Sequence, residues 1–185
     1  ELPEVEVVKN FLNSNFNGKR IQKIKILNKK LRYEIKTNIT KHFINLIITK
    51  IFRRGKYLIL LFENKYTLLV HLGMTGYFRI IKEENYMKHD HLVFYFESKL
   101  LVYNDIRKFG FIKFYKPDEV LNSQHLVKIG PEPFSKEYDF DYFKLNSKKT
   151  TNIKNLLMNQ NFVAGLGNIY CSEILFDAKI SPKKR

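Results

Sequence analysis

The sequence has one cysteine, Cys171, in 185 residues, no tryptophan, and no apolar run long enough to cross a membrane. A single cysteine excludes an intrachain disulfide and a cysteine-based zinc cluster within this segment. Since there is also no signal peptide or lipidation motif, the sequence predicts a soluble, intracellular chain with no membrane partner. Acidic residues are scarce as well, at 18 against 33 lysines and arginines, which gives a formal net charge of +15.

The positive charge is concentrated in one stretch of the chain. Between Lys19 and Lys56 there are 13 lysines and arginines but one acid, Glu34. A field of this strength favours a polyanion with closely spaced phosphates, so a nucleic acid is the expected partner. The alternative is a general lysine and asparagine bias of the source proteome, in which case the charge would carry no function.

The front of the chain is predicted to be mostly β-structure. Pro3 and the acids beside it favour a helix that ends around Asn15 to Gly18. Short alternating or β-branched runs follow, with links of two to four residues, which is typical of an antiparallel sandwich. The predicted strands cover residues 20–27, 47–54, 57–62, 67–72, 77–81, 91–97, 100–105 and 111–115.

The chain changes character after Pro117. Gly130-Pro131-Glu132-Pro133 predicts a linker, because neither helices nor central strands tolerate these residues well. Helical spacing of apolar residues follows over 138–145, 152–158 and 168–178. The predicted fold class is α+β, with a β-sandwich domain over residues 1–130 and a helical domain over 131–185.

Three carboxylates lie within six residues of the N-terminus, at Glu1, Glu4 and Glu6. One interpretation is a helix start whose acids complement the helix dipole. The other is a proton donor beside the terminal amine, whose pKa near 8 leaves a usable nucleophilic fraction at neutral pH. The sequence alone leaves both open.

Two loops carry residues that suit contact with distorted DNA. Met74 stands between two glycines in His-Leu-Gly-Met-Thr-Gly (71–76), where it is either a gap filler or an apolar wedge between bases. Arg107 and Phe109 are two residues apart, so they share a face if the chain is extended. They are either an edge aromatic with a solvated arginine or a hydrogen-bonding and intercalating pair.

Two further motifs have alternative interpretations. His89 and His91 would point to one side of a strand, but two histidines without a third ligand favour phosphate contact by His89 over a metal. The turn Val163 to Tyr170 opens onto a helix. Its amides could form a phosphate cradle with Asn168, or it could be a packing turn between helices.

Six motifs together resemble the bacterial formamidopyrimidine-DNA glycosylase family. They occur in the family's order and cover the chain: Glu-Leu-Pro-Glu-Val-Glu at 1–6, Arg-Arg-Gly-Lys-Tyr at 53–57, the loop at 71–76, the Arg107/Phe109 pair, Gly-Pro-Glu-Pro at 130–133 and Gly-Leu-Gly-Asn-Ile-Tyr at 165–170. The resemblance implies a sandwich domain followed by a helix–two-turn–helix domain. It also implies a bifunctional glycosylase and abasic-site lyase of base-excision repair. Such an enzyme flips 8-oxoguanine or formamidopyrimidines out of duplex DNA and passes through a Schiff base.

The resemblance assigns catalytic roles to two residues. Glu1 matches the acid that protonates the opening sugar, and Lys56 matches a lysine that contacts phosphate and assists elimination. The implied partner is double-stranded DNA with oxidised bases. The implied protein is a monomer of the bacterial cytoplasm, associated with the nucleoid.

The resemblance also assigns DNA contacts. Met74, Arg107 and Phe109 match the trio that fills the space left by the flipped base, with the arginine at the orphaned cytosine. Lys154 falls where the family approaches the damaged base. Contacts to the DNA fall on His71, His89, Arg107, Lys149 and Asn168.

Two family features are missing from this sequence. The family's nucleophile is an N-terminal proline directly before the residue matched by Glu1, and Pro3 matches its second proline instead. The family also ends in a four-cysteine zinc finger. We therefore expect no metal or other cofactor in this segment, and zinc in the finger of a full-length member. A catalytically silent DNA-binding fragment is the alternative function, and an RNA-binding module is a weaker one because no aromatic RNA-binding strand motif is present.

Overall fold

The computed structural model describes residues 1–147 and 151–184. Its chain contacts define two compact units. The sandwich unit comprises Val5–Arg53 and Tyr57–Val120, and the helical unit comprises Glu1–Glu4, Arg54–Lys56 and Leu121–Arg185. The elements are α1 (Leu2–Phe16), β1 (Lys23–Ile26), α2 (Thr37–Thr40), η1 (Lys41–Phe43), β2 (Ile48–Arg54), β3 (Tyr57–Phe62), β4 (Thr67–His71), β5 (Tyr77–Ile81), β6 (Asp90–Tyr95), β7 (Leu100–Asn104), β8 (Phe111–Tyr115), α3 (Phe140–Asn146), α4 (Ile153–Met158) and α5 (Asn168–Asp177).

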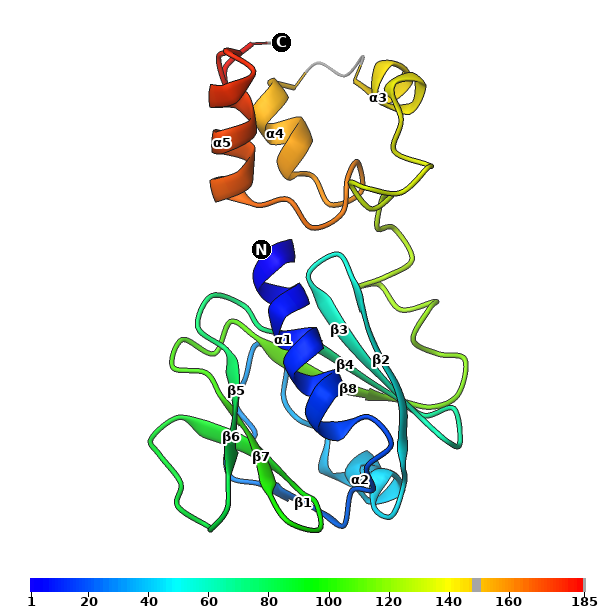
Figure 1. The fold of residues 1–185 in the computed structure, drawn as a ribbon, viewed down its shortest axis with the longest axis vertical. Coiled ribbons are helices and arrows are strands. Elements are labelled where there is room, and N and C mark those ends of the chain that lie inside the picture. The colour runs from blue at the N-terminus through cyan, green and yellow to red at the C-terminus, as the bar shows by residue number, and fades with distance from the viewer. Residues whose placement is uncertain (148–150, 185) are drawn as a thin grey trace. The chain divides into compact units, whose positions relative to one another are not determined.

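The sandwich unit contains two four-stranded sheets, in the orders β1-β6-β7-β5 and β2-β3-β4-β8 (Figure 1). The described pairings β1–β6, β6–β7, β5–β7, β3–β4 and β4–β8 are all antiparallel. Hairpin β3–β4 pairs Tyr57 with His71, and its turn uses Lys65 at φ 65. The pairings confirm the antiparallel sandwich that the alternating runs predicted.

The core of the sandwich unit takes apolar residues from both sheets and from α1. Leu12 and Phe16 of α1 are fully buried, as are Leu58 of β3 and Tyr103 of β7. These α1 residues are four apart, one turn of helix, so one face of α1 packs into the core. In Figure 1, α1 (blue) lies between the strands β5–β7 and the strands β2–β4.

The helical unit has a smaller core of its own, built around Leu156, Phe162, Cys171 and Leu175. Its helices begin at polar caps that the sequence supplies. The Asp139 side chain accepts from the backbone N–H of Tyr142 at the start of α3, and Asn152 accepts from Asn155 at the start of α4. The elements within 151–184 are α4 and α5, as expected for a helical segment.

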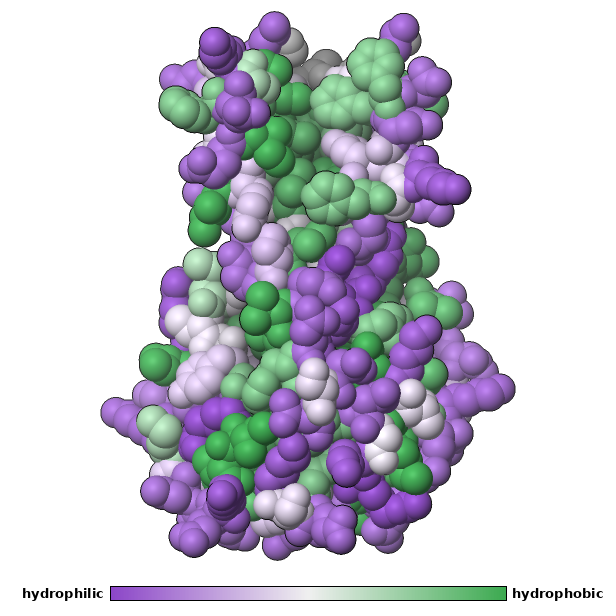
Figure 2. All heavy atoms as spheres, in the orientation of Figure 1, coloured by the Kyte–Doolittle hydropathy of each residue, from purple (hydrophilic) through white to green (hydrophobic). Residues whose placement is uncertain are grey.

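An apolar cavity of about 480 Å³ lies within the helical unit. Figure 2 shows hydrophobic side chains gathered between α5 and α3 on the viewed face of this unit. Leu2 and Pro3 line the cavity together with residues of α4 and α5. The first residues of the chain are thus packed among helices that come much later in the sequence.

The positions of the predicted strands and helices are confirmed to within a few residues. Strands β3, β5 and β8 begin and end where the sequence predicted, whereas β1 is shorter than the predicted 20–27. The structure adds α2 and η1, which the sequence did not predict. The domain boundary near residue 130 stays a prediction.

Candidate active site and nucleic-acid interface

The Glu1 side chain is held by the backbone at the start of α5. Its Oε2 accepts hydrogen bonds from the backbone N–H groups of Gly167 at 2.9 Å and Tyr170 at 3.2 Å, and Oε1 accepts from Ile169 at 2.7 Å. The side chain is 12% exposed. A carboxylate in this position complements the positive end of the helix dipole. The anion that these amides bind is therefore a carboxylate of the same chain rather than a phosphate.

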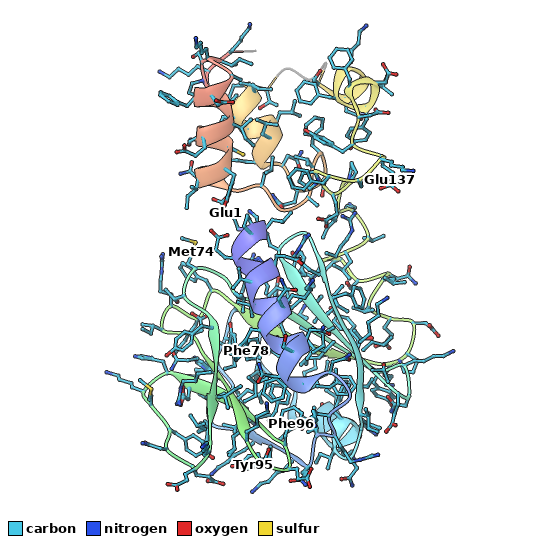
Figure 3. All side chains as sticks on the ribbon, in the orientation of Figure 1. Glu1, Met74, Phe78, Tyr95, Phe96 and Glu137 are labelled. Carbon is cyan, nitrogen blue, oxygen red and sulfur yellow. The ribbon has the colours of Figure 1, made fainter. Side chains whose placement is uncertain are left out.

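Two glycines make this approach of the chain start possible. A Cβ on Gly167 would lie 2.5 Å from the Glu1 carboxyl carbon, and a Cβ on Gly165 would lie 2.5 Å from Cδ1 of Leu2. Leu2 also donates its backbone N–H to the Gly165 carbonyl at 3.1 Å. The Gln160 side chain fixes the turn, since its Oε1 accepts from the Gly165 N–H and its Nε2 donates to the Leu166 carbonyl. Figure 3 shows Glu1 at the beginning of α1.

Lys56 lies in a turn that Glu132 anchors. The Glu132 Oε1 atom accepts from the backbone N–H of Gly55 at 2.6 Å and from Arg54 at 3.1 Å. Arg54 also donates to the carbonyls of Ile129 and Gly130. The segment 130–133 is irregular, as predicted, but it is bound to this turn and through Gly130 N–H to the Gln160 carbonyl, so it is not a free linker.

Lys56 and Glu1 interact electrostatically within the helical unit. Burial lowers the pKa of the half-buried Lys56 ammonium below its ordinary value, and the Glu1 carboxylate opposes that shift. Cys171 takes part in the same cluster: burial raises the pKa of its thiol, and Glu1 raises it further. A lysine with a lowered pKa beside a fixed carboxylate can bind an anion or exchange a proton.

Lys154 and Asn168 are linked through Ser172. Lys154 Nζ donates to Ser172 Oγ at 3.0 Å, and Ser172 Oγ donates to the Asn168 carbonyl at 2.7 Å. The Asn168 side chain is exposed at the start of α5. Lys149 lies outside the described residues. The DNA contacts of Lys149, Lys154 and Asn168 remain predictions.

Met74 and Phe109 are exposed on two adjoining loops of the sandwich unit. Met74 is 71% exposed and Phe109 is 50% exposed, which is unusual for large apolar side chains. Met74 extends from the tip of its loop (Figure 3). The loops touch through their backbones, because a Cβ on Gly73 would lie 2.5 Å from the Gly110 nitrogen. Arg107 lies over the Phe109 ring, with Cζ 4.6 Å from the centroid.

Arg107 and Phe109 share a side for a different reason from the one predicted. The segment between β7 and β8 is irregular, and Lys108 adopts φ 59, so alternation along an extended chain does not apply. The cation–aromatic contact brings the two side chains together instead. The pairing is as expected, but it rests on the left-handed turn at Lys108 together with the cation–aromatic contact and not on an extended chain.

The Asp105 side chain accepts hydrogen bonds from both of these loops. Its carboxylate is fully buried, and it accepts from Thr75 Oγ1 at 2.5 Å and from Gly110 N–H at 2.8 Å. Thr75 Oγ1 in turn accepts from the backbone N–H of Arg107 at 3.1 Å. One buried side chain therefore fixes both exposed loops. The sequence analysis gave Asp105 no role, although an acid between an apolar strand and a basic loop could have suggested one.

Three histidines of this unit, His71, His89 and His91, differ in setting. His71 is half-buried, and its Nδ1 accepts from the backbone N–H of Gly73, which places the ring proton on Nε2 as a donor. His89 precedes β6 at φ 71, so the two-residue alternation with His91 is wrong. His91 is buried, with Nε2 3.0 Å from the Asp105 carbonyl oxygen, so its ring lies in the interior of the unit.

The predicted site residues thus fall into two groups. Glu1, Lys56, Lys154 and Asn168 belong to the helical unit, and the others with described positions belong to the sandwich unit. Within the described residues no cluster of three or more histidine, cysteine or acidic side chains could hold a metal. Cys171 is buried in the helical core. With Cys171 as their one cysteine, the described residues cannot supply the four-cysteine zinc site that the resemblance implies for the family's terminal finger.

Comparison with known proteins gives the same family for both parts of the chain. The N-terminal domain of formamidopyrimidine-DNA glycosylase matches residues 1–112, and the helix–two-turn–helix domain of that family matches residues 129–185. The formamidopyrimidine-DNA glycosylase of Rickettsia bellii is 42% identical over the whole chain, which covers 68% of that relative. The Legionella pneumophila enzyme is 37% identical over 98% of the chain and 67% of the relative.

Solved structures agree. A Lactococcus lactis formamidopyrimidine-DNA glycosylase in complex with DNA that contains an abasic site has a TM-score of 0.92 and 38% identity, with all of this chain and 69% of that one covered. The same enzyme bound to DNA with a formamidopyrimidine lesion gives the same score, with 71% of its chain covered. The chain belongs to the formamidopyrimidine-DNA glycosylase family, whose members are DNA-repair glycosylases, and it spans about two thirds of these relatives.

The family assignment confirms the enzyme class and the α+β fold class that the motifs implied. The relatives are bacterial proteins. No helix among the described residues is long and apolar enough to cross a membrane.

Proposed function

We propose that the chain is a bifunctional glycosylase and abasic-site lyase that removes oxidised purines, such as 8-oxoguanine and formamidopyrimidines, from duplex DNA. The observation that carries the proposal is the Glu1 carboxylate, fixed by three backbone amides at the start of α5 and interacting with Lys56. An acid held in one orientation beside the chain's first residues suits proton transfer to a substrate that those residues attack.

The proposed reaction begins with an amine directly N-terminal to Glu1. The amine attacks C1′ of the flipped nucleotide, the bond from C1′ to the base breaks, and the base leaves with a proton. Glu1 protonates the ring oxygen as the sugar opens, which leaves a Schiff base between the amine and C1′. Loss of a proton from C2′ then expels the 3′ phosphate, and Lys56 binds the phosphate near that step.

The exposed loops supply the proposed lesion capture. Met74 and Phe109 enter the space left by the flipped base and offset the free-energy cost of unstacking. Arg107 donates hydrogen bonds to the cytosine that the flipped base leaves unpaired. His71, His89, Lys149 and Asn168 contact the DNA backbone, and Lys154 approaches the damaged base. We propose a monomer that works on the nucleoid in the bacterial cytoplasm. Its relatives' complexes with abasic and damaged DNA support the choice of partner.

Borohydride trapping tests this proposal. A chain with proline placed before Glu1 should form a covalent adduct with duplex DNA that contains 8-oxoguanine, because the Schiff base is reduced to a stable amine. The same chain carrying Lys56→Ala should still form the adduct but cleave the strand more slowly. A chain that begins at Glu1 should form little adduct, because its terminal amine lies one residue away from the proposed point of attack.

Two outcomes would overturn the proposal. Efficient trapping by the printed sequence, unchanged by the added proline and lost in Lys56→Ala, would make Lys56 the nucleophile. Tight binding to lesion DNA without adduct or base release in any form would favour a catalytically silent DNA-binding protein.

A further inference from the structure

A wide groove lies in the sandwich unit, and none of its lining residues is assigned to lesion capture. It has a volume of about 1,080 Å³, which is above the range of about 300–1,000 Å³ usual for small-molecule sites. One wall is the segment 32–39, which includes the start of α2, and the other is β8 with the residues after it. A groove of this size suits a segment of a polymer better than a metabolite.

Positive charge is crowded along the groove. Arg32, Lys36, Lys113 and Lys116 line it, against the carboxylates of Glu34 and Glu119. Burial lowers the pKa of the Lys113 ammonium, and the neighbouring Lys36 and Arg32 lower it further. Glu119 accepts a hydrogen bond from the backbone N–H of Lys116, so part of the acidic charge is engaged within the loop. An anion in the groove would relieve the repulsion among these cations.

Aromatic side chains alternate with these cations. Tyr33, Phe114 and Tyr115 line the same groove and are half-buried. The Lys113 ammonium lies 3.8 Å from the centroid of the Tyr33 ring. A basic groove with interleaved aromatic rings is the arrangement by which proteins bind single-stranded nucleic acids without sequence preference.

The groove is also fastened to the loop that carries Phe109. The Arg32 backbone N–H donates to the carbonyl of Gly110 at 3.1 Å. One wall of the groove is thus hydrogen-bonded to the residue that follows Phe109, in a loop that also carries Arg107 and Lys108. This connection favours a nucleic acid over an acidic peptide as the occupant.

We propose that this groove binds a single-stranded segment of nucleic acid, with its phosphates on Arg32, Lys36, Lys113 and Lys116 and its bases against Tyr33 and Tyr115. The groove uses no residue assigned to catalysis. Its binding is independent of whether the chain excises bases, and either proposal can fail without the other.

Fluorescence anisotropy with labelled oligothymidine of 15 nucleotides tests the groove. The double variant Lys36→Glu/Lys116→Glu should weaken binding about tenfold and lower the slope of log K against log salt by about 1.4, since each lost phosphate contact accounts for about 0.7. The matched control is Lys50→Glu/Lys82→Glu, which makes the same charge change on β2, at the opposite edge of the β8 sheet, and after β5. It should weaken binding less than threefold.

Further variants and probes keep the test decisive. Lys36→Gln/Lys116→Gln avoids charge reversal and should still lower the salt slope, which guards against misfolding of the first pair. An oligomer of abasic units with the same number of phosphates should bind more weakly than oligothymidine because it has no bases to stack. Equal losses in both charge-reversed pairs, or tighter binding of a poly-glutamate peptide than of oligothymidine, would overturn the proposal.

Discussion

The helical unit holds its candidate catalytic acid directly, whereas the sandwich unit leaves its candidate DNA contacts exposed and fixes the loops beneath them. Glu1 is bound by three backbone amides and is largely buried. Met74 and Phe109 have exposed side chains, and the buried Asp105 organises the backbone that carries them. A proton donor must keep one orientation, whereas a wedge must be free to enter a base stack.

The contrast predicts different consequences of mutation in the two units. Substitutions at Glu1 should reduce the rate of base release more than the affinity for DNA. Substitutions around Asp105 should reduce the affinity for damaged DNA more than the rate of base release from DNA that is already bound. The following variants test this difference, from the largest expected effect to the smallest.

In the proline-bearing chain, Glu1→Gln should lower the single-turnover rate of base release by about a hundredfold or more, the usual contribution of a general acid. Glutamine keeps the shape and one of the two acceptor oxygens, but its NH2 group cannot accept from the remaining amides and it cannot give up a proton. The control is Glu137→Gln, an exposed carboxylate of the same unit (Figure 3). An unchanged rate in Glu1→Gln would remove the acid from the mechanism.

Gly73→Ala should destabilise the protein by about 2 kcal/mol more than Gly18→Ala does, as measured by urea unfolding. Both glycines have positive φ, 65 and 74, so both substitutions carry the same backbone penalty. A Cβ on Gly18 meets open space, whereas one on Gly73 meets the backbone of Phe109 and Gly110. Equal losses would mean that the two loops are not in contact.

Thr75→Val should weaken binding to abasic-site DNA about tenfold, because it leaves the Asp105 carboxylate and the Arg107 N–H each without the Thr75 hydroxyl, at about 1–3 kcal/mol. Thr75→Ser keeps the hydroxyl and should restore most of the affinity. If serine is as poor as valine, the hydroxyl and its hydrogen bonds do not by themselves hold the loop.

Met74→Ala should weaken binding to lesion DNA several-fold more than binding to intact duplex, because apolar wedges act on unstacking and not on the phosphates. Met87→Ala is the matched control, since Met87 is also exposed in the sandwich unit, at 56%. Equal losses on the two duplexes would show that Met74 is not a wedge.

Glu1→Gln should shift the titration of Lys56 to lower pH. Burial already lowers the Lys56 pKa, and the Glu1 carboxylate is the largest opposing influence, so its loss leaves the neutral amine favoured over a wider pH range. NMR of chains with 13C-methylated lysines would follow this titration, and Glu137→Gln should leave it in place. A shift to higher pH would contradict the electrostatic coupling of the two residues.

Much of the fold was predictable from local patterns. The strands followed from alternation and β-branched runs such as Tyr57–Phe62, and the later helices from apolar spacing. Helix α2 was missed because Thr-Asn-Ile-Thr has no helical period and lies in a short, strongly basic segment. Most of the motifs that identified the family stand in loops or turns whose residues the backbone constrains, such as Gly73 and Gly165 at positive φ, whereas the first lies at the start of α1.

The site was less predictable where it depends on distant partners. Nothing local shows that Glu1 binds the amides of Gly167, Ile169 and Tyr170, or that Glu132 fixes the turn before Lys56. The predicted alternation of His89 and His91 failed because His89 adopts a left-handed conformation that sequence periodicity cannot detect. The individual DNA contacts remain predictions.

The hydrogen bonds between Glu1 and the start of α5 also set an order of assembly during synthesis. They join residues separated by 166 to 169 positions, nearly the full length of the described chain. A ribosome makes the amino-terminal residues first, so Glu1 waits without its amide donors until α5 has emerged, while the sandwich residues up to Val120 are already available to fold. A nascent chain can therefore form the exposed loops of the sandwich unit before the Glu1 carboxylate has its amide donors, so the chemistry proposed for Glu1 would begin only when the helical unit is complete.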